Sequence, residues 1–464
     1  MMRNVPKGIF KKYDIRGTAE GPDAVITPEN ARWIGLGFGT YVQRNAQLNQ
    51  VVIGRDNRRT SFALYEAFVD GLMTSGCNVI RLDLVATPVV YWHAVRRGGV
   101  GGVMITGSHL APDQNGFKLC IGSKALFGTQ IQTLRSFIES GDLTYGAGTQ
   151  SLDLSSYTRY VDDLAERLPM SRPLRVVVDA GNGIAGLFTE RLMKAFGHEL
   201  VDCLYCELDG SFPNHPANPQ EAENMRDLGE KVRAVGADVG IAFDGDADRM
   251  GIVDEHGEPV VADRVLALLA RDLLRRKPGA AVVADVLSSQ ALFDEIQRCG
   301  GKGIMSASGH SLVKAKMAET KALLGGEMSG HLFLDEDYYG FDDGFFAAGR
   351  FLQFLSSESQ SVSMLDASLP HYFSTPEYRP HCPDAEKRRV IEGVQAALQD
   401  AGEVITVDGV RIQFESGWGL LRASNTEPVL SLRFEGKTET DALRYRDIFF
   451  EALVEIYPQV KLDM

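Results

Sequence analysis

Three segments of the chain repeat one pattern, and this repetition limits the fold more than any other feature. Each opens with a short run of β-branched residues that ends near an aspartate: VVIGRD at 51–56, RVVVDAGNG at 175–183 and AVVADVLSS at 281–289. A helix-like stretch and a second short strand follow each run, which is typical of a βα unit in a parallel sheet. The near-even spacing of about 110 residues predicts three similar α/β domains.

The C-terminal part of the chain has a different pattern. Strand-like alternation with Gly and Asn turns runs through 404–438, and helical stretches at 386–400 and 440–456 flank it. These features predict a separate α+β domain with an antiparallel sheet. The Asp-Gly pair at 408–409 indicates a hairpin between two of its strands.

Polar gaps rich in Gly or Ser near 140–156, 254–259 and 356–370 separate these parts. We therefore expect four domains, with the boundaries 1–152, 153–256, 257–369 and 370–464.

The charge balance restricts the partners of the chain. It has 48 Lys and Arg residues against 62 Asp and Glu residues, a formal net charge of −14. Such a chain repels polyanions, so a nucleic-acid partner is not expected. An anionic substrate would have to be held by a local cluster of basic groups and backbone N–H donors.

Neither a signal peptide nor an apolar window of the ~18 residues that a membrane span needs is evident. The six cysteines are scattered, which is typical of a reducing compartment. We expect a cytoplasmic protein with no membrane partner. Cys203 and Cys206 form a C-x-x-C in an apolar stretch, and we interpret them as buried structural thiols.

The first segment with chemical character is 101–118, where a strand runs into Gly107-Ser108-His109. Ligands bind at strand ends in open α/β sheets, so a hydroxyl there is well placed as a nucleophile or phosphate carrier. The alternative is an ordinary serine in a Gly-rich turn.

The second segment carries Asp244, Asp246 and Asp248 between two apolar strands. Three carboxylates on one turn repel one another, and a divalent cation relieves that repulsion. Oxygen ligands favour Mg²⁺ or Ca²⁺ over zinc. Glu255 falls at the twelfth position of a calcium-binding hand, but Arg249 stands where that motif needs Gly. A solvated acidic turn is the alternative.

The third segment places Glu327, Ser329 and His331 between glycines. In an extended loop their alternation would put the three side chains on one face, suited to the hydroxyls of a sugar. A hairpin whose polar edge faces water is equally compatible with this segment.

The fourth segment gathers Arg422, Ser424, Asn425 and Thr426 between two strands. A guanidinium, two hydroxyls, an amide and turn N–H groups together form the kind of cluster that binds a phosphate. A loop that merely caps the strands is the alternative.

These segments stand in a fixed order with other short motifs: FKKYDIRG, TGSH, NGFK, DAGNGIAG, FPNH, FDGDADR, GHSLVK, GEMSGH, YGFDDG and RASNTEP. Together they resemble the α-D-phosphohexomutase superfamily, and most closely its bacterial phosphomannomutase/phosphoglucomutase group. The resemblance covers nearly the whole chain. It implies an α/β fold of three similar domains with mixed, mainly parallel sheets plus a C-terminal α+β domain, arranged around a central cleft.

The resemblance also implies a reaction. The chain would be an isomerase that interconverts the 1-phosphate and 6-phosphate of mannose, glucose or both, through a phosphoserine and a 1,6-bisphosphate intermediate. Mg²⁺ would be the cofactor and glucose 1,6-bisphosphate the activator. The partner would be a small phosphosugar, and the protein a monomer or weak dimer.

Site residues carry over position by position. The catalytic residues implied are Ser108, His109, Lys118, Arg249 and His310. The substrate-binding residues implied are Tyr13, Arg16, Glu327, Ser329, His331, Arg422, Ser424, Asn425 and Thr426. Asp244, Asp246 and Asp248 would hold the metal together with an oxygen of phosphorylated Ser108. The general base stays open among Lys118 and the two histidines at 310 and 331.

The chain departs from the group at several places. Leu110-Ala111 replaces the usual Asn-Pro of the serine loop, and Leu287 stands where near relatives often carry Lys. Alternatives are a phosphoglucosamine mutase, although Met328 argues against it, and a catalytically degenerate bisphosphohexose-binding protein. A Mg²⁺-dependent phosphatase is a third, and it would release inorganic phosphate.

Overall fold

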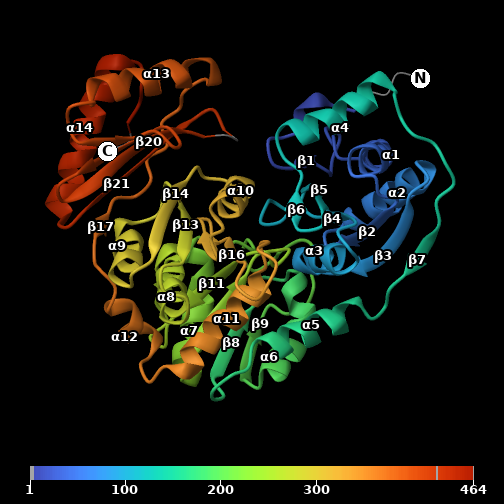
Figure 1. Ribbon diagram of the computed structural model, residues 1–464, viewed down its shortest axis with the longest axis horizontal. Helices are drawn as coiled ribbons and strands as arrows, with labels where there is room; N and C mark the ends of the chain where they lie inside the picture. Colours follow the sequence, from blue (N-terminus) through green and yellow to red (C-terminus); the bar gives the residue numbers. More distant parts are fainter. Residues whose placement is uncertain (1–4, 425–426, 463–464) are drawn as a thin grey trace. The chain divides into compact units, whose positions relative to one another are not determined.

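The computed structural model describes residues 5–424 and 427–462 (Figure 1). Asn425 and Thr426 therefore lie outside the described residues. The chain forms two compact units, and each is described by itself. Unit 1 comprises the residues up to Ala262 together with Ser329–Ser363, and unit 2 comprises Asp263–Met328 and the residues from Met364 onward.

The first sheet of unit 1 is mixed, with parallel strands at its centre. In spatial order its strands are β1 (Ile15–Thr18), β5 (Gln114–Ile121), β4 (Gly101–Ile105), β2 (Gln50–Arg55), β3 (Asn78–Leu84) and β7 (Gln150–Leu152), and β6 (Lys124–Ala125) pairs with β5. Strand β2 is parallel to β3 and β4, whereas β5 is antiparallel to β4 and β1. Its helical elements are η1 (Lys7–Ile9), α1 (Pro28–Asn45), α2 (Ser61–Thr74), α3 (Thr87–Arg96) and α4 (Thr129–Ser140).

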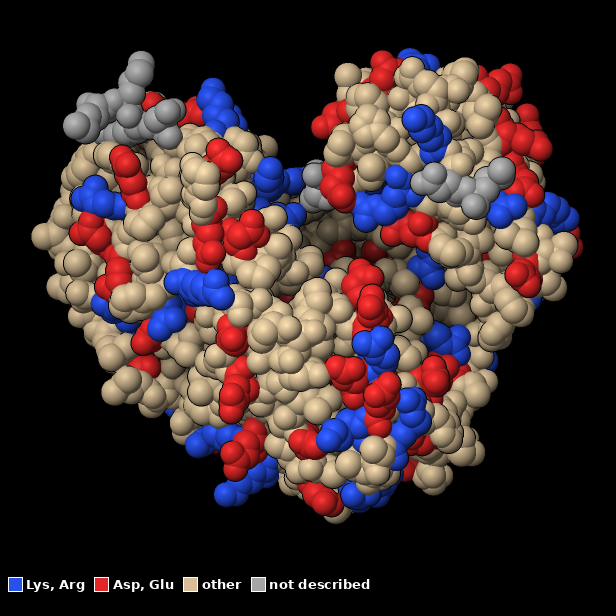
Figure 2. Space-filling model, turned by 180° about the vertical axis from the view of Figure 1, so that it is seen from behind, with Lys and Arg blue, Asp and Glu red and all other residues tan. Residues whose placement is uncertain are grey.

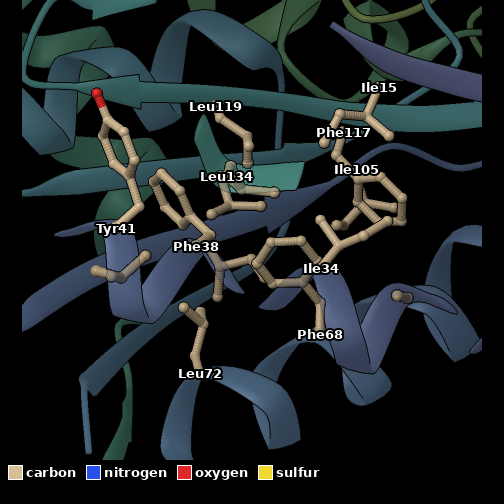
Figure 3. Close-up of a cluster of buried hydrophobic side chains, with 14 of the residues drawn as sticks. Ile15, Ile34, Phe38, Tyr41, Phe68, Leu72, Ile105, Phe117, Leu119 and Leu134 are labelled. Atoms are coloured by element: carbon tan, nitrogen blue, oxygen red, sulfur yellow. The ribbon is translucent and has the colours of Figure 1, made fainter. Parts of the chain in front are cut away.

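A hydrophobic core lies between this sheet and helices α1, α2 and α4 (Figure 3). The ring of Phe68 on α2 contacts both Phe38 of α1 and Phe117 of β5, with centroid distances of 6.5 Å and 5.3 Å. Helix α1 begins where Thr27 caps it: the hydroxyl accepts a hydrogen bond from Asn30 N, and Pro28 follows at the first helical position. Each fully buried large apolar side chain contributes about 1.5–3 kcal/mol to stability. This core therefore holds the strands of the first sheet in place, including β4 and β5.

The second sheet of unit 1 repeats the topology of the first. In spatial order its strands are β12 (Pro259–Val260), β11 (Met250–Val253), β10 (Val239–Phe243), β8 (Arg175–Asp179) and β9 (Glu199–Leu204). Strand β8 is parallel to β9 and β10, and β11 is antiparallel to β10, as β5 is to β4. Its helical elements are α5 (Ser156–Arg167), η2 (Ile184–Leu187), α6 (Thr189–Phe196), η3 (Ala222–Met225) and α7 (Arg226–Val235).

Strand β16 (Leu332–Leu334) and helix α11 (Gly344–Ser357) also belong to unit 1. Asp343 caps α11 by accepting a hydrogen bond from Phe346 N, and it accepts another from the hydroxyl of Tyr160 at 2.7 Å. Phe345 stacks on Phe188 with ring centroids 5.0 Å apart. Apolar packing and a buried capping carboxylate thus hold α11 against the second sheet.

Unit 2 contains two kinds of sheet. Strands β14 (Lys302–Ser306), β13 (Ala281–Asp285) and β15 (Leu324–Gly326) are parallel, and β17 (Phe373–Ser374), β21 (Leu430–Gly436), β20 (Gly417–Ala423), β19 (Val410–Phe414) and β18 (Glu403–Ile405) form an antiparallel sheet. The remaining helices are α8 (Ala262–Arg276), α9 (Gln290–Arg298), α10 (His310–Thr320), α12 (Val362–Ala367), α13 (Asp384–Ala397) and α14 (Glu439–Ile456).

The predicted repetition is confirmed. Strands β2, β8 and β13 are the three β-branched runs, and each is parallel to the strand that follows its helix. The antiparallel C-terminal sheet and the Asp-Gly hairpin between β18 and β19 also agree with the sequence pattern. One polar gap contains a strand: β7 adds to the edge of the first sheet, parallel to β3.

The interpretation of Cys203 and Cys206 as buried thiols is wrong. The two residues are half-buried and joined by a disulfide. Strand β9 ends at Leu204, and Tyr205 adopts a left-handed φ of 51°, which turns the chain and brings the two Cα atoms to 5.9 Å. The sequence pattern did not reveal this turn, because Tyr rarely adopts such a backbone conformation.

Acidic and basic side chains are interspersed over the face of the molecule that Figure 2 presents. Within residues 5–424 and 427–462, no helix combines the length and the apolar character that crossing a membrane requires.

Buried His93 makes the stability of the fold sensitive to acid. Burial lowers the pKa of His93 to about 4, and its Nε2 lies 3.3 Å from the carbonyl oxygen of Ser156. The unfolded chain takes up the proton near pH 6.5 while the folded chain resists it until about pH 4, so stability falls as the pH drops through this window. The cost reaches about 3 kcal/mol at the acid end.

We expect His93→Gln to reduce the loss of melting temperature between pH 7 and pH 4.5, measured by circular dichroism. His256→Gln, at a side chain that is 69% exposed, serves as the control and should keep the wild-type loss. An identical loss in all three proteins would show that His93 does not carry the acid sensitivity.

Candidate active site

Ser108 lies in the loop between β4 and β5, at the carboxyl end of a buried parallel strand. Its Oγ donates a hydrogen bond to Oδ2 of Asp244 at 2.8 Å and lies 3.2 Å from Nδ1 of His109. Its backbone has a φ of 49°, a left-handed conformation that is unusual for a residue with a side chain. Only 9% of Ser108 is exposed, and it lines a pocket together with Arg16, Thr106 and Lys118.

The acidic triad occupies the equivalent loop of the second sheet, between β10 and β11. Asp244, Asp246 and Asp248 are buried, and one oxygen from each carboxylate lies within 4.8 Å of the others. Burial raises the pKa of Asp244 well above its ordinary value, and the charges of Asp248 and Asp246 raise it further. Glu255 instead accepts hydrogen bonds from Ser363, and strands flank the triad, so a calcium-binding hand is excluded.

The triad fits a hard divalent cation. Oδ1 of Asp246 is buried and has no hydrogen-bond partner among the described residues, while Oδ2 accepts one from Oγ1 of Thr87. A buried carboxylate oxygen without a partner is costly unless a cation neutralises it. An all-oxygen donor set of this kind suits Mg²⁺.

Lys118 of β5 supplies a positive charge next to the triad. Its Nζ pairs with Oδ2 of Asp246 at 2.7 Å and with Oδ2 of Asp248. Burial on its own would lower the pKa of Lys118, but the surrounding carboxylates raise it far above its ordinary value. A general base needs a free lone pair, so this ion pair favours Lys118 as a charge-balancing group. In return, Lys118 offsets the burial of Asp246 and lowers its pKa to about 2.

Arg249 connects the triad to the segment 329–331. Its Nε donates to Nε2 of His331 at 3.2 Å, and its Nη1 donates to the carbonyl oxygen of Ser329 at 3.4 Å. Because Nε2 of His331 accepts, its Nδ1 carries the proton and donates to Oγ of Ser329 at 3.0 Å. Arg249, burial and Lys118 together lower the pKa of His109 to about 2, so His109 is neutral.

The extended conformation predicted for 327–331 is wrong. Residues 328–330 form a turn, and Gly330 has a φ of 87°. A Cβ at Gly330 would lie 2.1 Å from the amide nitrogen of Gln220, so the approach to this side chain requires glycine. Alternation of side chains along this segment therefore does not hold.

Arg16 and Tyr13 lie at the start of the first sheet. Arg16 belongs to β1, and its Nε lies 3.4 Å from Oδ1 of Asp14. Tyr13 precedes β1, with Nζ of Lys12 5.2 Å from the centroid of its ring. Of the two, Arg16 lines the pocket of Ser108.

In unit 2, hydrogen bonds connect the loops of three predicted site residues, Glu327, His310 and Arg422. Oε1 of Glu327 accepts from Gly309 N at 2.5 Å, next to His310, the first residue of α10. Asp408 accepts from Ser308 N at 3.2 Å and from Nε of Arg422 at 2.9 Å. Asp408 thus links the loop of His310 to the guanidinium proposed to bind phosphate.

Ser424 ends the described part of the fourth loop. Its Oγ accepts a hydrogen bond from Glu427 N at 3.2 Å. Nζ of Lys387, on α13, donates to the carbonyl oxygens of Ser424 at 2.9 Å and Glu427 at 2.5 Å. Buried Lys387 therefore bonds to the described residues at both ends of this loop, Ser424 and Glu427.

Sequence reasoning missed Thr87, Lys387 and Asp408. Thr87 begins α3 and Lys387 lies on α13, and neither is part of a recognisable motif. Asp408 was interpreted only as a turn residue, although its carboxylate faces Arg422. Leu287, at the position of an expected lysine, packs beside Val286 and Trp418, and its carbonyl oxygen accepts from Nη1 of Arg433 at 2.9 Å.

Known proteins match the chain along its length. The four parts of one family, described as phosphoglucomutase/phosphomannomutase, match in order: alpha/beta/alpha domain I at residues 7–144, domain II at 158–257, domain III at 262–373 and the C-terminal domain at 378–452.

Two relatives and one solved structure give the degree of similarity. The phosphomannomutase/phosphoglucomutase of Pseudomonas putida is 42% identical over 460 residues, 99% of this chain and 98% of the relative. The phosphoglucomutase of Neisseria gonorrhoeae is 40% identical over 466 residues, 99% of each chain. The crystal structure of a phosphoglucomutase/phosphomannomutase family protein from Burkholderia thailandensis has a TM-score of 0.93 and 39% identity, and the match covers 99% of this chain and 100% of that one.

Proposed function

The chain belongs to the phosphoglucomutase/phosphomannomutase family of the α-D-phosphohexomutase superfamily and is a phosphohexomutase, and we propose that Ser108 carries the phosphoryl group in its reaction. The substrate would be the 1-phosphate or 6-phosphate of mannose, glucose or both. One observation carries the proposal: Oγ of Ser108 lies 2.8 Å from Asp244 of a buried acidic triad. A nucleophilic oxygen beside a cation site is what phosphoryl transfer needs.

The proposed reaction has two transfers. The P–O bond to Ser108 breaks as the free hydroxyl of the sugar phosphate bonds to phosphorus, and a base takes the hydroxyl proton. The resulting 1,6-bisphosphate reorients, and Oγ of Ser108 bonds to its other phosphorus. The P–O bond to the sugar breaks, and the proton held by the base passes to the sugar oxygen that leaves. Phosphate is conserved on sugar and serine throughout, which distinguishes a mutase from a phosphatase.

The charges around Ser108 support this chemistry. A phosphoserine carries about −1.5 to −2 charge, and it would face the carboxylate of Asp244. Arg249 lies 3.8 Å from Asp244, Lys118 pairs with Asp246, and Arg16 lines the pocket of Ser108. We propose that these three positive charges neutralise the transferring group. Neutral His109, 3.2 Å from Oγ, is able to orient it without adding charge.

We propose that Asp244, Asp246 and Asp248 hold Mg²⁺ together with an oxygen of phosphorylated Ser108. A bound Mg²⁺ would supply electrostatic stabilisation of the phosphoryl oxygens. Two observations support this assignment: Oδ1 of Asp246 is buried without a hydrogen-bond partner among the described residues, and the triad offers only oxygen donors.

The substrate-binding roles in the proposal rest on family resemblance. Glu327 and Ser329 would bind sugar hydroxyls, and Tyr13 and His331 would complete the binding of the substrate. Arg422, Ser424, Asn425 and Thr426 would hold the phosphate that does not react. The resemblance leaves the general base open among Lys118, His310 and His331. The ion pairs of Lys118 and the hydrogen bond from Arg249 to Nε2 of His331 favour His310.

Further parts of the proposal concern the protein as a whole. We propose the domain boundaries 1–152, 153–256, 257–369 and 370–464, which the four family matches and the strand β7 ending at Leu152 support. Glucose 1,6-bisphosphate would prime Ser108. The protein would act in the cytoplasm as a monomer or weak dimer, with neither nucleic acid nor membrane as a partner.

The alternative of a phosphoglucosamine mutase is not favoured, because the relatives with 40–42% identity are phosphoglucomutases or phosphomannomutase/phosphoglucomutases. The test is phosphorus NMR with Mg²⁺, a trace of glucose 1,6-bisphosphate, and mannose, glucose or glucosamine 1-phosphate in separate tubes. Conversion to 6-phosphate without free phosphate is expected with mannose or glucose. Fastest conversion of the glucosamine compound would contradict the substrate assignment, and release of phosphate would contradict the mutase reaction.

Removing the Arg422 guanidinium is expected to weaken substrate binding. A charge-assisted hydrogen bond is worth about 1.5–3 kcal/mol, so Arg422→Gln should raise KM for glucose 1-phosphate by about 10- to 100-fold. The effect on kcat should be smaller, since this phosphate does not react.

Arg444→Gln on α14, where the side chain is 60% exposed, is the matched control and should keep the wild-type KM. Steady-state kinetics of all three proteins decide the point. An unchanged KM in Arg422→Gln would remove this residue from the phosphate site.

A further inference from the structure

The loop of Ser108 has few means of fixing its own shape. Its backbone closes two turns, in which Leu110 N donates to Gly107 O at 2.9 Å and Gln114 N donates to Ala111 O at 3.0 Å. Leu110 and Ala111 offer no side-chain hydrogen-bonding group. Ser108 nevertheless holds a left-handed φ of 49°, and a conformation of this kind persists only where its surroundings enforce it.

Arg58 supplies those surroundings. It follows β2, and only 2% of it is exposed. Its guanidinium donates four hydrogen bonds to carbonyl oxygens of this single loop: from Nη2 to Ser108 at 2.7 Å and Leu110 at 2.7 Å, and from Nη1 to Ala111 at 2.6 Å and Gln114 at 3.0 Å. The rigid, planar guanidinium directs its donors at four carbonyl oxygens in fixed directions, whereas an ammonium group has only three donors on a single atom.

The guanidinium is itself held in place. Asp56, which is also buried, pairs with Nε of Arg58 at 3.3 Å, and its Oδ2 accepts a hydrogen bond from Gly107 N at 3.3 Å. Burial raises the pKa of Asp56 although Arg58 opposes that effect. The ring of Phe212, from the second-sheet part of unit 1, lies 4.9 Å from Cζ of Arg58. A Cβ at Gly107 would lie 2.6 Å from Cζ of Arg58, so the guanidinium packs directly on the loop backbone.

We infer that Arg58 is a positioning residue for the phosphoryl-carrying serine: its four hydrogen bonds to the loop carbonyls keep Oγ of Ser108 directed at the acidic triad. This inference rests on the proposed role of Ser108. Arg58 acts through the backbone carbonyl groups of residues 108–114, and among the described residues it forms no hydrogen bond with Asp244, Asp246 or Asp248. Arg58 thus affects the reaction by fixing the backbone geometry of the loop and is not itself a reacting group.

The prediction for Arg58→Lys separates positioning from folding. A lysine keeps the positive charge beside Asp56 but lacks the planar fork, so the loop loses most of its donors. We expect kcat to fall by about 100-fold, the cost of an ångström-scale misplacement of a reacting group, while KM for glucose 1-phosphate stays close to the wild-type value. We expect the melting temperature of Arg58→Lys to stay well above the assay temperature, so that the kinetics are measured on fully folded protein.

Arg350→Lys is the control. Arg350 is a buried arginine of the same unit that pairs with Glu336 and Gln353 rather than with the serine loop. This variant should keep the wild-type kcat. An equal fall of kcat in both variants, or a kcat of Arg58→Lys close to wild type, would overturn the inference.

Hydrogen–deuterium exchange provides a readout that does not depend on turnover. Amides of residues 107–115 should exchange at least about tenfold faster in Arg58→Lys than in wild type and Arg350→Lys, the equivalent of one lost hydrogen bond. Unchanged exchange in this segment would refute the positioning role. If wild type itself fails to interconvert sugar phosphates, the proposed function fails, and the exchange result alone decides the role of Arg58.

Discussion

Ser108→Ala is expected to abolish mutase turnover, with kcat lowered by at least about 1,000-fold. The variant loses the oxygen that carries the phosphoryl group, and covalent catalysis through the serine has no substitute in the loop. The surroundings of the position should stay intact, because the backbone bond from Ser108 N to Oγ1 of Thr106 and the four bonds from Arg58 do not involve the hydroxyl. A coupled assay with glucose 1-phosphate, Mg²⁺ and glucose 1,6-bisphosphate measures the change.

The matched control is Ser136→Ala on α4, whose exposed hydroxyl donates a hydrogen bond to the carbonyl oxygen of Thr133. It should keep the wild-type kcat. Activity of Ser108→Ala within tenfold of wild type would assign the phosphoryl group to another residue.

Asp244→Asn is expected to uncouple stability from activity. Without metal, three buried carboxylates repel one another, so replacing one of them should leave the melting temperature of metal-free protein unchanged or higher. The same change weakens the proposed cation site and removes the carboxylate that faces Ser108. We expect kcat to fall by about 100- to 1,000-fold.

Mg²⁺ should raise the melting temperature of the wild type and raise that of Asp244→Asn much less, because a ligand that binds only the folded state stabilises it. A chelator should stop wild-type turnover, and added Mg²⁺ should restore it. Asp162→Asn, at a side chain that is 62% exposed on α5, should respond to Mg²⁺ as the wild type does. An equal Mg²⁺ response in all three proteins would place the metal elsewhere.

The fold could be predicted to a large extent because its signals are local. The runs at 51–56, 175–183 and 281–289 became the parallel strands β2, β8 and β13, since β-branched runs followed by amphipathic helices leave few alternatives. Strand β7 was missed because residues 150–152 are exposed and lie in a polar segment, so no buried apolar pattern marks their pairing with β3. The turn at 328–330 was missed because alternation is ambiguous in a glycine-rich segment.

The sequence singles out residue types suited to the proposed site but not the contacts between them. Ser108 and the triad stand out in the sequence because the packing of two apolar strands does not require them. Nothing in the sequence pairs Arg58 with the carbonyl oxygens of a loop fifty residues away, since backbone acceptors carry no residue identity. Asp408 shows the same limit: Asp in an Asp-Gly turn is expected for its conformation, and its pairing with Arg422 depends on tertiary structure.

Phosphoryl transfer through Ser108 is tested by following the phosphoryl group itself. Wild-type protein with Mg²⁺ is incubated with glucose 1,6-bisphosphate, chased with excess glucose 1-phosphate, and sampled by peptide mass spectrometry at each step. We predict phosphorylation at Ser108 after priming, and loss or exchange of that group during the chase at a rate no slower than kcat. Phosphorylation at another residue, or a phosphorylated Ser108 that does not exchange with substrate while turnover proceeds, would contradict this prediction.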